Sequence, residues 1–209
     1  MRHGRDMRRT RIALCLVTAL LSGQTFAADQ AMRAKIAEQK AEVLEQKAEA
    51  GDSPPRAVLI TRPGVQAVDP AGEAPLDNAI TCLARSIYWE TKGKNQTEMA
   101  AVANVVMNRL RHEQFPKTVC EVVTQGSEQG RCQFSWWCDG RSDDAQEEAA
   151  YTLAKEIARQ ALNQQLPDRT DDAVYFQNRH ASPRWLADFI KTYETDAHAF
   201  YKPSDGAKQ

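Results

Sequence analysis

The 209-residue sequence lacks several features that would place it in a specialised class of protein. No apolar run reaches the roughly 18–20 residues that a helix needs to cross a bilayer, which excludes a polytopic membrane protein. Lys and Arg (27) nearly balance Asp and Glu (28), so no basic surplus points to nucleic acid as a partner. Aromatic residues are few, at 7%, and no internal repeat is present. The remaining composition, 42% hydrophobic and 26% charged, is typical of an ordinary globular domain.

The first 27 residues have the composition of a secretory signal peptide. Five arginines and one aspartate lie at the start, the apolar run 12–21 follows, and Thr25 and Ala27 are small residues before a possible cut. We expect cleavage after Ala27 and export across the inner membrane, to the periplasm or the cell envelope. The mature chain would carry 22 basic and 27 acidic residues, a net charge near −5. An uncleaved membrane anchor is the alternative.

The chain has five cysteines, and four of them remain once the signal segment is removed. In an oxidising compartment an even number favours two disulfides, although sequence alone permits three pairings. A local bridge between Cys132 and Cys138 is plausible, and Cys82 with Cys120 would then join two separate elements. A zinc site is the competing interpretation, but the paired C-x-x-C spacing is absent. We assign no metal and no cofactor.

Composition divides the mature chain into three parts. Residues 28–76 combine helix formers over 29–50, which carry only a thin apolar stripe, with a stretch rich in proline and glycine over 51–76. We expect an exposed helix over 29–50, with a short oligomerising helix as the alternative, and a flexible linker after it. This part of the chain is also a candidate for contacting a partner protein. The folded domain is expected over 77–203, followed by a tail over 204–209.

Within the domain, helical periodicity and capping residues predict a mainly α protein. Asp77 or Asn78 caps a helix that runs to about Thr91, and Asn95 with Glu98 resembles a capping box for a second helix. The other expected elements are helices over 119–125, from 143 or 144 to 163, and over 184–193, with a strand over 173–177.

Glu90 is the candidate catalytic residue. Leu83, Ile87 and Glu90 are spaced i, i+4, i+7, so a carboxylate lies on the stripe that faces the core. Partial burial beside Tyr88 penalises the charged form, raises the pKa and suits the group to act as a general acid. A frayed helix end with Glu90 in water is the alternative.

Several ordered blocks resemble the SleB/CwlJ-type cell wall hydrolases, a family that includes the spore cortex-lytic enzymes. These are residues 82–93 (CLARSIYWETKG), 101–109 (AVANVVMNR), 115–119 (FPKTV), 132–135 (CQFS), 183–185 (PRW) and 198–201 (HAFY). The resemblance implies an α+β, mainly α, lysozyme-like domain whose essential acid is Glu90. It also implies a lytic transglycosylase acting on the glycan strands of peptidoglycan, at the N-acetylmuramic acid–N-acetylglucosamine bond. Relatives commonly carry a glutamate where this sequence has Lys94. This chain therefore lacks a second acid at that position.

Other residues are candidates for binding the glycan, each with a structural alternative. Aromatic faces stack on sugar rings, and polar groups on a strand can reach a cleft. The candidates are Tyr88, Phe134, Ser135, Trp136, Tyr175 and Gln177. Arg109 could pair with a buried carboxylate or lie exposed at a helix end, and His198 is expected to hold the C-terminal segment.

Two other functions remain open at this point. One is an N-acetylmuramoyl-L-alanine amidase, an enzyme class that usually depends on zinc. The other is a peptidoglycan-binding protein without catalysis, although such a protein would be expected to lack an acidic residue at position 90.

Overall fold

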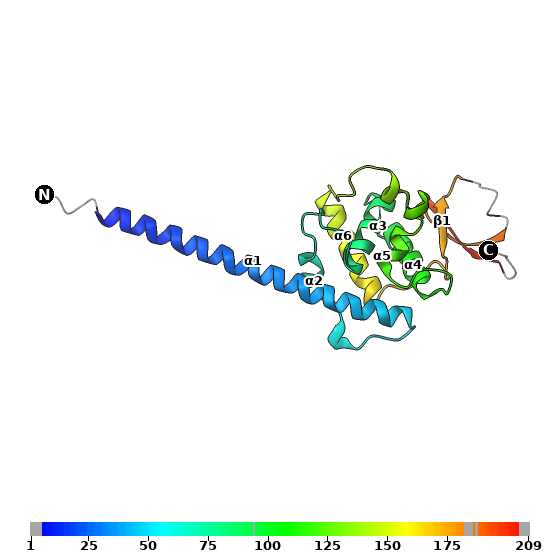
Figure 1. Cartoon of the computed structure of the whole chain (residues 1–209), viewed down its shortest axis with the longest axis horizontal. Helices are drawn as coiled ribbons and strands as arrows, with labels where there is room; N and C mark the ends of the chain where they lie inside the picture. The colour runs from blue at the N-terminus through cyan, green and yellow to red at the C-terminus, as the bar shows by residue number, and fades with distance from the viewer. Residues whose placement is uncertain (1–5, 94, 182–185, 187, 205–209) are drawn as a thin grey trace.

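A computed structural model describes residues 6–93, 95–181, 186 and 188–204 of the chain, with side chains from residue 26 onward. A helical body carries a small sheet at its C-terminal end, and the first half of α1 extends away from that body (Figure 1). The elements, in chain order, are α1 (Asp6–Glu49), η1 (Arg56–Val58), α2 (Arg62–Ala67), α3 (Ala79–Thr91), α4 (Gln96–Arg111), α5 (Val119–Thr124), η2 (Ser127–Gln129), η3 (Ser135–Cys138), α6 (Glu148–Leu162), β1 (Tyr175–Asn178), β2 (Phe189–Glu194) and β3 (His198–Pro203).

Side-chain caps begin three helices where the sequence predicted them. Asn78 accepts a hydrogen bond from the backbone N–H of Thr81 at the start of α3. Asn95 caps α4, and Thr118 caps α5, in the same manner. Each cap satisfies a backbone donor that the first turn of a helix would otherwise leave without a partner.

The helix α6 begins later than predicted, at Glu148 rather than near residue 143. The backbone carbonyl of Asp143 accepts hydrogen bonds from Arg85 and Trp89, and Ala145 donates to the carbonyl of Gly72. These tertiary bonds hold residues 143–145 outside the helix.

The predicted helix over 184–193 is wrong where the structure describes the chain. Phe189–Glu194 forms the strand β2, while residues 182–185 and 187 lie outside the described residues. The sheet has the order β1-β3-β2 and is antiparallel throughout, with Phe176 opposite Phe200 and Ile190 opposite Lys202. Aromatic and β-branched residues in 189–193 favour a strand once a partner is present.

The core is built around α3. Its stripe of Ile80, Leu83, Ala84 and Ile87 is fully buried, as the periodicity predicted, and packs with α4, α5 and α6. The mainly helical fold with a small sheet is therefore confirmed.

The interpretation of residues 29–50 as an exposed helix is wrong. Ala37, Ala41, Leu44 and Ala48 lie along one side of α1 and are buried in the same core as α3. Three of the four are alanines, whose small side chains let a helix backbone approach its neighbours closely. A stripe of this kind is hard to recognise from hydrophobicity alone.

Part of the proline- and glycine-rich stretch 51–76 is also packed, against α6. Ile60 exchanges hydrogen bonds with the side chain of Asn163 at the end of α6. Lys155 of α6 donates to the carbonyls of Gln66, Val68 and Asp69. Residues 60–69 are thus tied to α6 and differ from the flexible linker that the proline and glycine content suggested.

Both expected disulfides are present. Cys82–Cys120 joins α3 to α5, with the two Cα atoms 5.2 Å apart, and Cys132–Cys138 closes the loop that contains η3. In the part of the chain that the structure describes, no helix is long and apolar enough to cross a membrane.

Candidate active site

Glu90 lies in the last turn of α3, where two left-handed residues turn the chain toward α4. Lys92 has φ +49° and Gly93 has φ +67°. A Cβ atom on Gly93 would lie 2.6 Å from the Cβ of Ala150, so only glycine fits there without a shift. This turn places the end of α3 beside α6.

The Glu90 carboxyl group is half-buried and lies near basic side chains. Burial raises its pKa from the ordinary value to about 7, and the charges of His198, Arg109 and Lys92 oppose that rise. Among the described residues, no negatively charged group contributes to the shift of the Glu90 pKa. A carboxyl group of this kind is protonated in a large fraction of molecules near neutral pH and can also release its proton there.

Arg109 is the most buried of the three cations. Its side chain leaves α4, Nε donates to the carbonyl of Val174 at 2.7 Å, and the guanidinium lies about 5–6 Å from the rings of Phe115, Phe134 and Tyr175. Burial lowers its pKa to about 10, so it stays charged at neutral pH. The alternative of an exposed Arg109 is wrong, because the side chain is buried. Glu90 is the carboxylate with which it interacts electrostatically.

Lys92 lies over one of two stacked tryptophans at the end of α3. The Lys92 ammonium lies 3.1 Å from the centre of the Trp89 ring, and Trp89 stacks on Trp136 with ring centres 6.5 Å apart. The indole N–H of Trp89 donates to Asp143. The indole N–H of the buried Trp136 has no partner within the described chain.

The predicted glycan-binding residues do not all meet at Glu90. Phe134 and Tyr175 lie against Arg109, and Trp136 lies against Trp89. Ser135 is exposed in the disulfide loop, and the half-buried Gln177 donates to the carbonyl of Ala181.

For Tyr88 and Phe134, the expectation of glycan contact is corrected. Tyr88 is 2% exposed, and its hydroxyl accepts a hydrogen bond from the backbone N–H of Glu147. Phe134 is 1% exposed, and both side chains belong to the core. The same correction applies to Trp136, which is 5% exposed and belongs to the same core.

Glu98 makes a contact that the sequence did not predict. Its backbone N–H donates to the side-chain oxygen of the capping residue Asn95, as predicted, but its carboxylate hydrogen-bonds Nδ1 of His198 instead of completing a capping box. The two residues lie 100 positions apart, so no local pattern could have indicated the contact. His198 therefore ties β3 to α4, as expected. It also acts to lower the pKa of Glu90.

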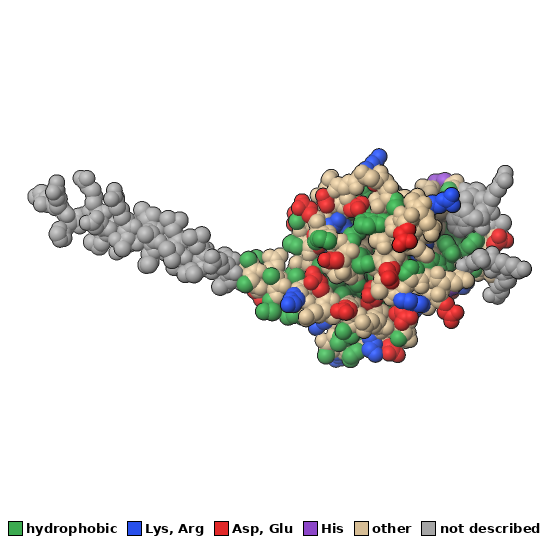
Figure 2. All heavy atoms as spheres, in the orientation of Figure 1, with side chains coloured by type: hydrophobic (Ala, Val, Ile, Leu, Met, Phe, Trp, Pro, Cys, Tyr) green, Lys and Arg blue, Asp and Glu red, His purple; other side chains and the backbone are tan. Residues whose placement is uncertain are grey.

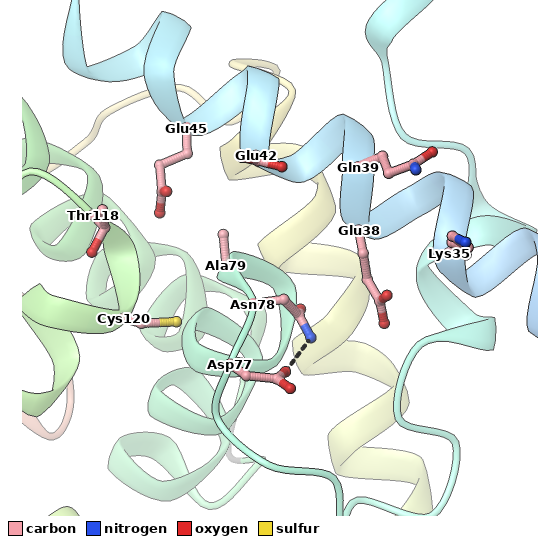
Figure 3. A pocket seen from close by; sticks show the side chains of 10 residues that line it. All are labelled: Lys35, Glu38, Gln39, Glu42, Glu45, Asp77, Asn78, Ala79, Thr118 and Cys120. Carbon is pink, nitrogen blue, oxygen red and sulfur yellow. Dashed lines mark hydrogen bonds between the residues drawn. The ribbon is translucent and has the colours of Figure 1, made fainter.

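A hollow of the molecule lies away from Glu90. It has a volume of about 560 Å³ between α1 and the first turns of α3 and α5, and its lining carboxylates are Glu38, Glu42, Glu45 and Asp77 (Figure 3). The Glu45 carboxylate accepts a hydrogen bond from the backbone of Val119, so it helps to hold α1 on α5. Glu90 does not line this hollow.

Across the residues with described side chains, no group of three or more His, Cys, Asp or Glu is arranged to hold a metal ion.

Comparison with known proteins gives a family and several relatives. The family described as Cell Wall Hydrolase matches residues 93–201, so the match begins just after Glu90. Two curated relatives, both spore cortex-lytic enzymes of Bacillus cereus, are 27% identical over 128 residues. The aligned region covers 60% of this chain and 44% of each relative, so the chain matches less than half of their length.

Two solved structures are also similar to this chain. The catalytic domain of the germination-specific lytic transglycosylase SleB from Bacillus anthracis is 28% identical, with a TM-score of 0.50, over 60% of this chain and 95% of that domain. The catalytic domain of Bacillus cereus SleB is 27% identical, with a TM-score of 0.48, over 59% of this chain and 89% of that domain.

Proposed function

This chain belongs to the cell wall hydrolase family, and from that premise we propose that it cleaves peptidoglycan as a lytic transglycosylase, with Glu90 as both general acid and general base. The substrate would be the glycan strand, at the N-acetylmuramic acid–N-acetylglucosamine bond. A solved relative of similar fold is described as a lytic transglycosylase, which supports this choice among cell wall activities.

The observation that carries the proposal is the surroundings of Glu90. A general acid is most effective when its pKa lies near the working pH, and burial brings the pKa of Glu90 to about 7. The basic residues Arg109, Lys92 and His198 act to lower the pKa of Glu90, which favours the carboxylate that forms once the proton has been given away. The same group can therefore act first as an acid and then as a base.

One carboxyl group is enough for this reaction. Protonated Glu90 gives its proton to the glycosidic oxygen while the bond from the muramic acid C1 to that oxygen breaks, and N-acetylglucosamine leaves as an alcohol. The carboxylate then takes the proton of the muramic acid C6 hydroxyl as that oxygen attacks C1 and closes a 1,6-anhydro ring. No water enters the reaction, so the second carboxylate of ordinary glycosidases has no task.

The electrostatics of the site agree with a one-acid mechanism. The described side chains that act electrostatically on Glu90 are basic. Relatives commonly carry a glutamate where this chain has Lys94, a residue outside the described part of the chain. A hydrolytic route that relies on a second acid at that position is not available to this chain.

We further propose that the protein works in the periplasm or cell envelope after removal of residues 1–27. Peptidoglycan lies outside the inner membrane, and the disulfides Cys82–Cys120 and Cys132–Cys138 suit an oxidising compartment.

The product identifies the reaction. Purified sacculi incubated with the protein should release muropeptides that end in 1,6-anhydro-muramic acid, detected by mass spectrometry. Glu90→Gln should lower the rate by at least about 10²-fold, the usual contribution of a general acid. The variant should fold with unchanged or higher stability, because it removes a carboxylate whose ionisation is penalised by burial.

Glu121→Gln is the matched control, since it makes the same chemical change at an exposed position and should leave the rate unchanged. Muropeptides with reducing muramic acid ends would indicate hydrolysis of the glycan, and free stem peptides would indicate an amidase. Binding to sacculi without any product would indicate a protein without catalysis. Each of these three results contradicts the proposal.

A further inference from the structure

Trp89 is an aromatic residue beside Glu90 whose orientation is fixed by its contacts. The two residues are consecutive in the last turn of α3, and both are half-buried. The indole N–H of Trp89 donates to the carbonyl of Asp143 at 2.9 Å, and its ring stacks on the buried Trp136 with an interplanar angle of 12°. The same carbonyl accepts a hydrogen bond from the buried Arg85, so the acceptor is held in place as well. The indole therefore has a fixed position next to the candidate acid.

The ammonium group of Lys92 covers the Trp89 ring. Its Nζ atom lies 3.1 Å from the centre of that ring and 5.4 Å from the centre of the Tyr88 ring. A cation over the face of an indole is attracted by the negative charge of the π system. The Lys92 side chain is exposed and its four-carbon stem is flexible, so it can leave the ring without disturbing the core.

Lysine is an unfavourable residue at position 92. The residue ends α3 with φ +49° and ψ +37°, in the left-handed region that glycine and asparagine adopt more readily. Its backbone N–H donates to the carbonyl of Tyr88, a bond that any residue except proline could make. The turn therefore does not require a lysine, which indicates that the side chain has a task of its own on the Trp89 ring.

The other aromatic side chains near the end of α3 offer less accessible ring surface. Tyr88, Phe134 and Trp136 are at most 5% exposed. Trp137 is half-buried and meets Trp136 edge-on with ring centres 6.1 Å apart, but it belongs to the disulfide loop and not to α3. Of these five residues, Trp89 combines a fixed orientation, a removable cover and a place next to the candidate acid.

We propose that the face of Trp89 beneath Lys92 is a subsite for one pyranose ring of the glycan strand, and that Lys92 is a cover which the sugar displaces. The inference rests on the proposed function, because it takes the glycan as the ligand and places it beside Glu90. The C–H groups on one face of a pyranose carry partial positive charge, so the sugar and the ammonium compete for the same negative ring face. An indole that is already oriented loses little conformational entropy when a sugar stacks on it.

The first test is NMR of the unmodified protein with the tetramer of N-acetylglucosamine as the probe. This probe presents pyranose rings without stem peptides. In the free protein, the ring current of Trp89 should shift the signals of the Lys92 side chain upfield. Adding the tetramer to millimolar concentration should return them to ordinary positions and shift the indole N–H signal of Trp89. Lys92 signals that stay upfield throughout the titration, whether or not the probe binds elsewhere, would overturn the inference.

Substitution of Lys92 distinguishes a cover from a group that holds the sugar. Lys92→Asn suits the left-handed turn and removes the ammonium, so the tetramer should bind about 2- to 5-fold more tightly, as expected for the loss of an exposed cation–π contact. Lys92→Arg keeps a cation that stacks on aromatic rings, so binding should not become tighter. Weaker binding by Lys92→Asn would mean that the lysine holds the sugar, and unchanged binding would mean that it only packs on the ring. Either result contradicts the proposal.

Lys117→Asn is the matched control for this change. Lys117 is an exposed lysine whose ammonium lies 3.6 Å from a carboxylate oxygen of Glu49, and its substitution should leave the affinity for the tetramer unchanged.

Removal of the indole tests the subsite itself. Trp89→Leu should weaken binding of the tetramer by about 10-fold, because leucine keeps apolar volume but offers no ring face. Trp137→Leu is the matched control, since it removes another half-buried indole that contacts Trp136, and it should leave the affinity nearly unchanged. Circular dichroism checks that each variant folds, and the NMR titration and the Lys92 variants decide if Trp89→Leu does not. An effect confined to Trp137→Leu would contradict the proposal.

Failure of the proposed function is distinguishable from failure of this inference, because binding of the tetramer needs no catalysis. A protein that releases nothing from sacculi, but in which the tetramer displaces Lys92, would lose the function and keep the subsite. A protein that forms anhydro-muramyl products while Lys92 stays on Trp89 at saturating tetramer would keep the function and lose the subsite.

Discussion

Among the buried and half-buried carboxylates of this protein, Glu90, Glu98 and Asp69 have partners that give them different properties. Glu90 has no hydrogen bond from a described residue, so burial dominates and raises its pKa. Glu98 and Asp69 are also penalised by burial, but hydrogen bonds to their ionised forms lower the pKa of each. The same chemical group thus provides a proton donor at one place and fixed negative charge at two others.

Asp69 is the clearest case of a carboxylate that stabilises the fold. Its side chain is 2% exposed and accepts hydrogen bonds from Arg85 at 2.8 Å and from the Tyr151 hydroxyl at 2.7 Å. Its other oxygen accepts two backbone N–H groups, from Glu73 and Ala74. Asp69→Asn leaves Arg85 buried without its anion and should reduce the free energy of unfolding by about 3–5 kcal/mol at pH 7.

Urea unfolding measures this loss of stability, and the pH dependence of the unfolding free energy tests the direction of the Asp69 pKa shift. Burial opposes ionisation of Asp69, but the hydrogen bonds outweigh it and hold the folded pKa below the ordinary value of 3.8. The stabilisation is therefore present above that value and is lost as the pH falls through the folded pKa. Asp69→Asn should not show this loss of stability as the pH falls. Asp52→Asn, which breaks the exposed pair with Lys47, should cost less than about 1 kcal/mol, and equal effects of the two variants would contradict the argument.

At the scale of elements, α1 shows how a helix can enter a core with few large apolar residues. Figure 1 shows its C-terminal half lying along the helical body, and charged and apolar side chains are mixed on the visible face of that body (Figure 2). Leu44 is the one large residue on its buried stripe, whereas Met32, Ile36 and Val43 are exposed. Burial of this half of α1 therefore depends on a single leucine between alanines.

Neighbouring residues of α1 give a matched pair for testing this packing. Leu44→Ala should reduce the free energy of unfolding by about 2–4 kcal/mol, because it leaves a cavity in the core. Val43→Ala, at a position that is 39% exposed, should change it by no more than about 0.5 kcal/mol. Thermal and urea unfolding measure both. Similar small effects would mean that α1 is not part of the cooperative unit.

At the scale of the whole molecule, the family domain is one part of a larger folded unit. The family match begins at Gly93, while α1, α2 and α3 precede it and share its core. Cys82–Cys120 connects the two parts covalently and closes a loop with a sequence separation of 38, which stabilises the folded chain by about 4 kcal/mol in the chain-entropy description.

Export and oxidation should both be visible in the mass of the intact protein. Protein recovered from the cell envelope should lack residues 1–27, begin at Ala28 and resist thiol alkylation unless it is first reduced. Protein made without residues 1–27 in a reducing cytosol should be alkylated at its cysteines. A full-length mass in the envelope fraction would support an uncleaved anchor and contradict cleavage after Ala27.

Much of the helical domain could be predicted because its signals are local. Asn78, Asn95 and Thr118 begin helices through bonds to residues three positions onward, and the stripe that contains Leu83 repeats within one helix. The helix expected over 184–193 failed because strand pairing depends on a partner, here β3, that local sequence does not reveal. The start of α6 was displaced by hydrogen bonds that arrive from α3 and from Gly72.

The sequence by itself determined the helical stripes, their caps and the acid at position 90, because these depend on neighbours within one or two turns. Only the tertiary structure decided that Arg109 and His198 lie around that acid, that Glu98 holds His198, and that the alanines of α1 are buried. The physical reason is distance along the chain. Desolvation and charge act through space, and the groups that tune Glu90 come from elements that folding alone brings together.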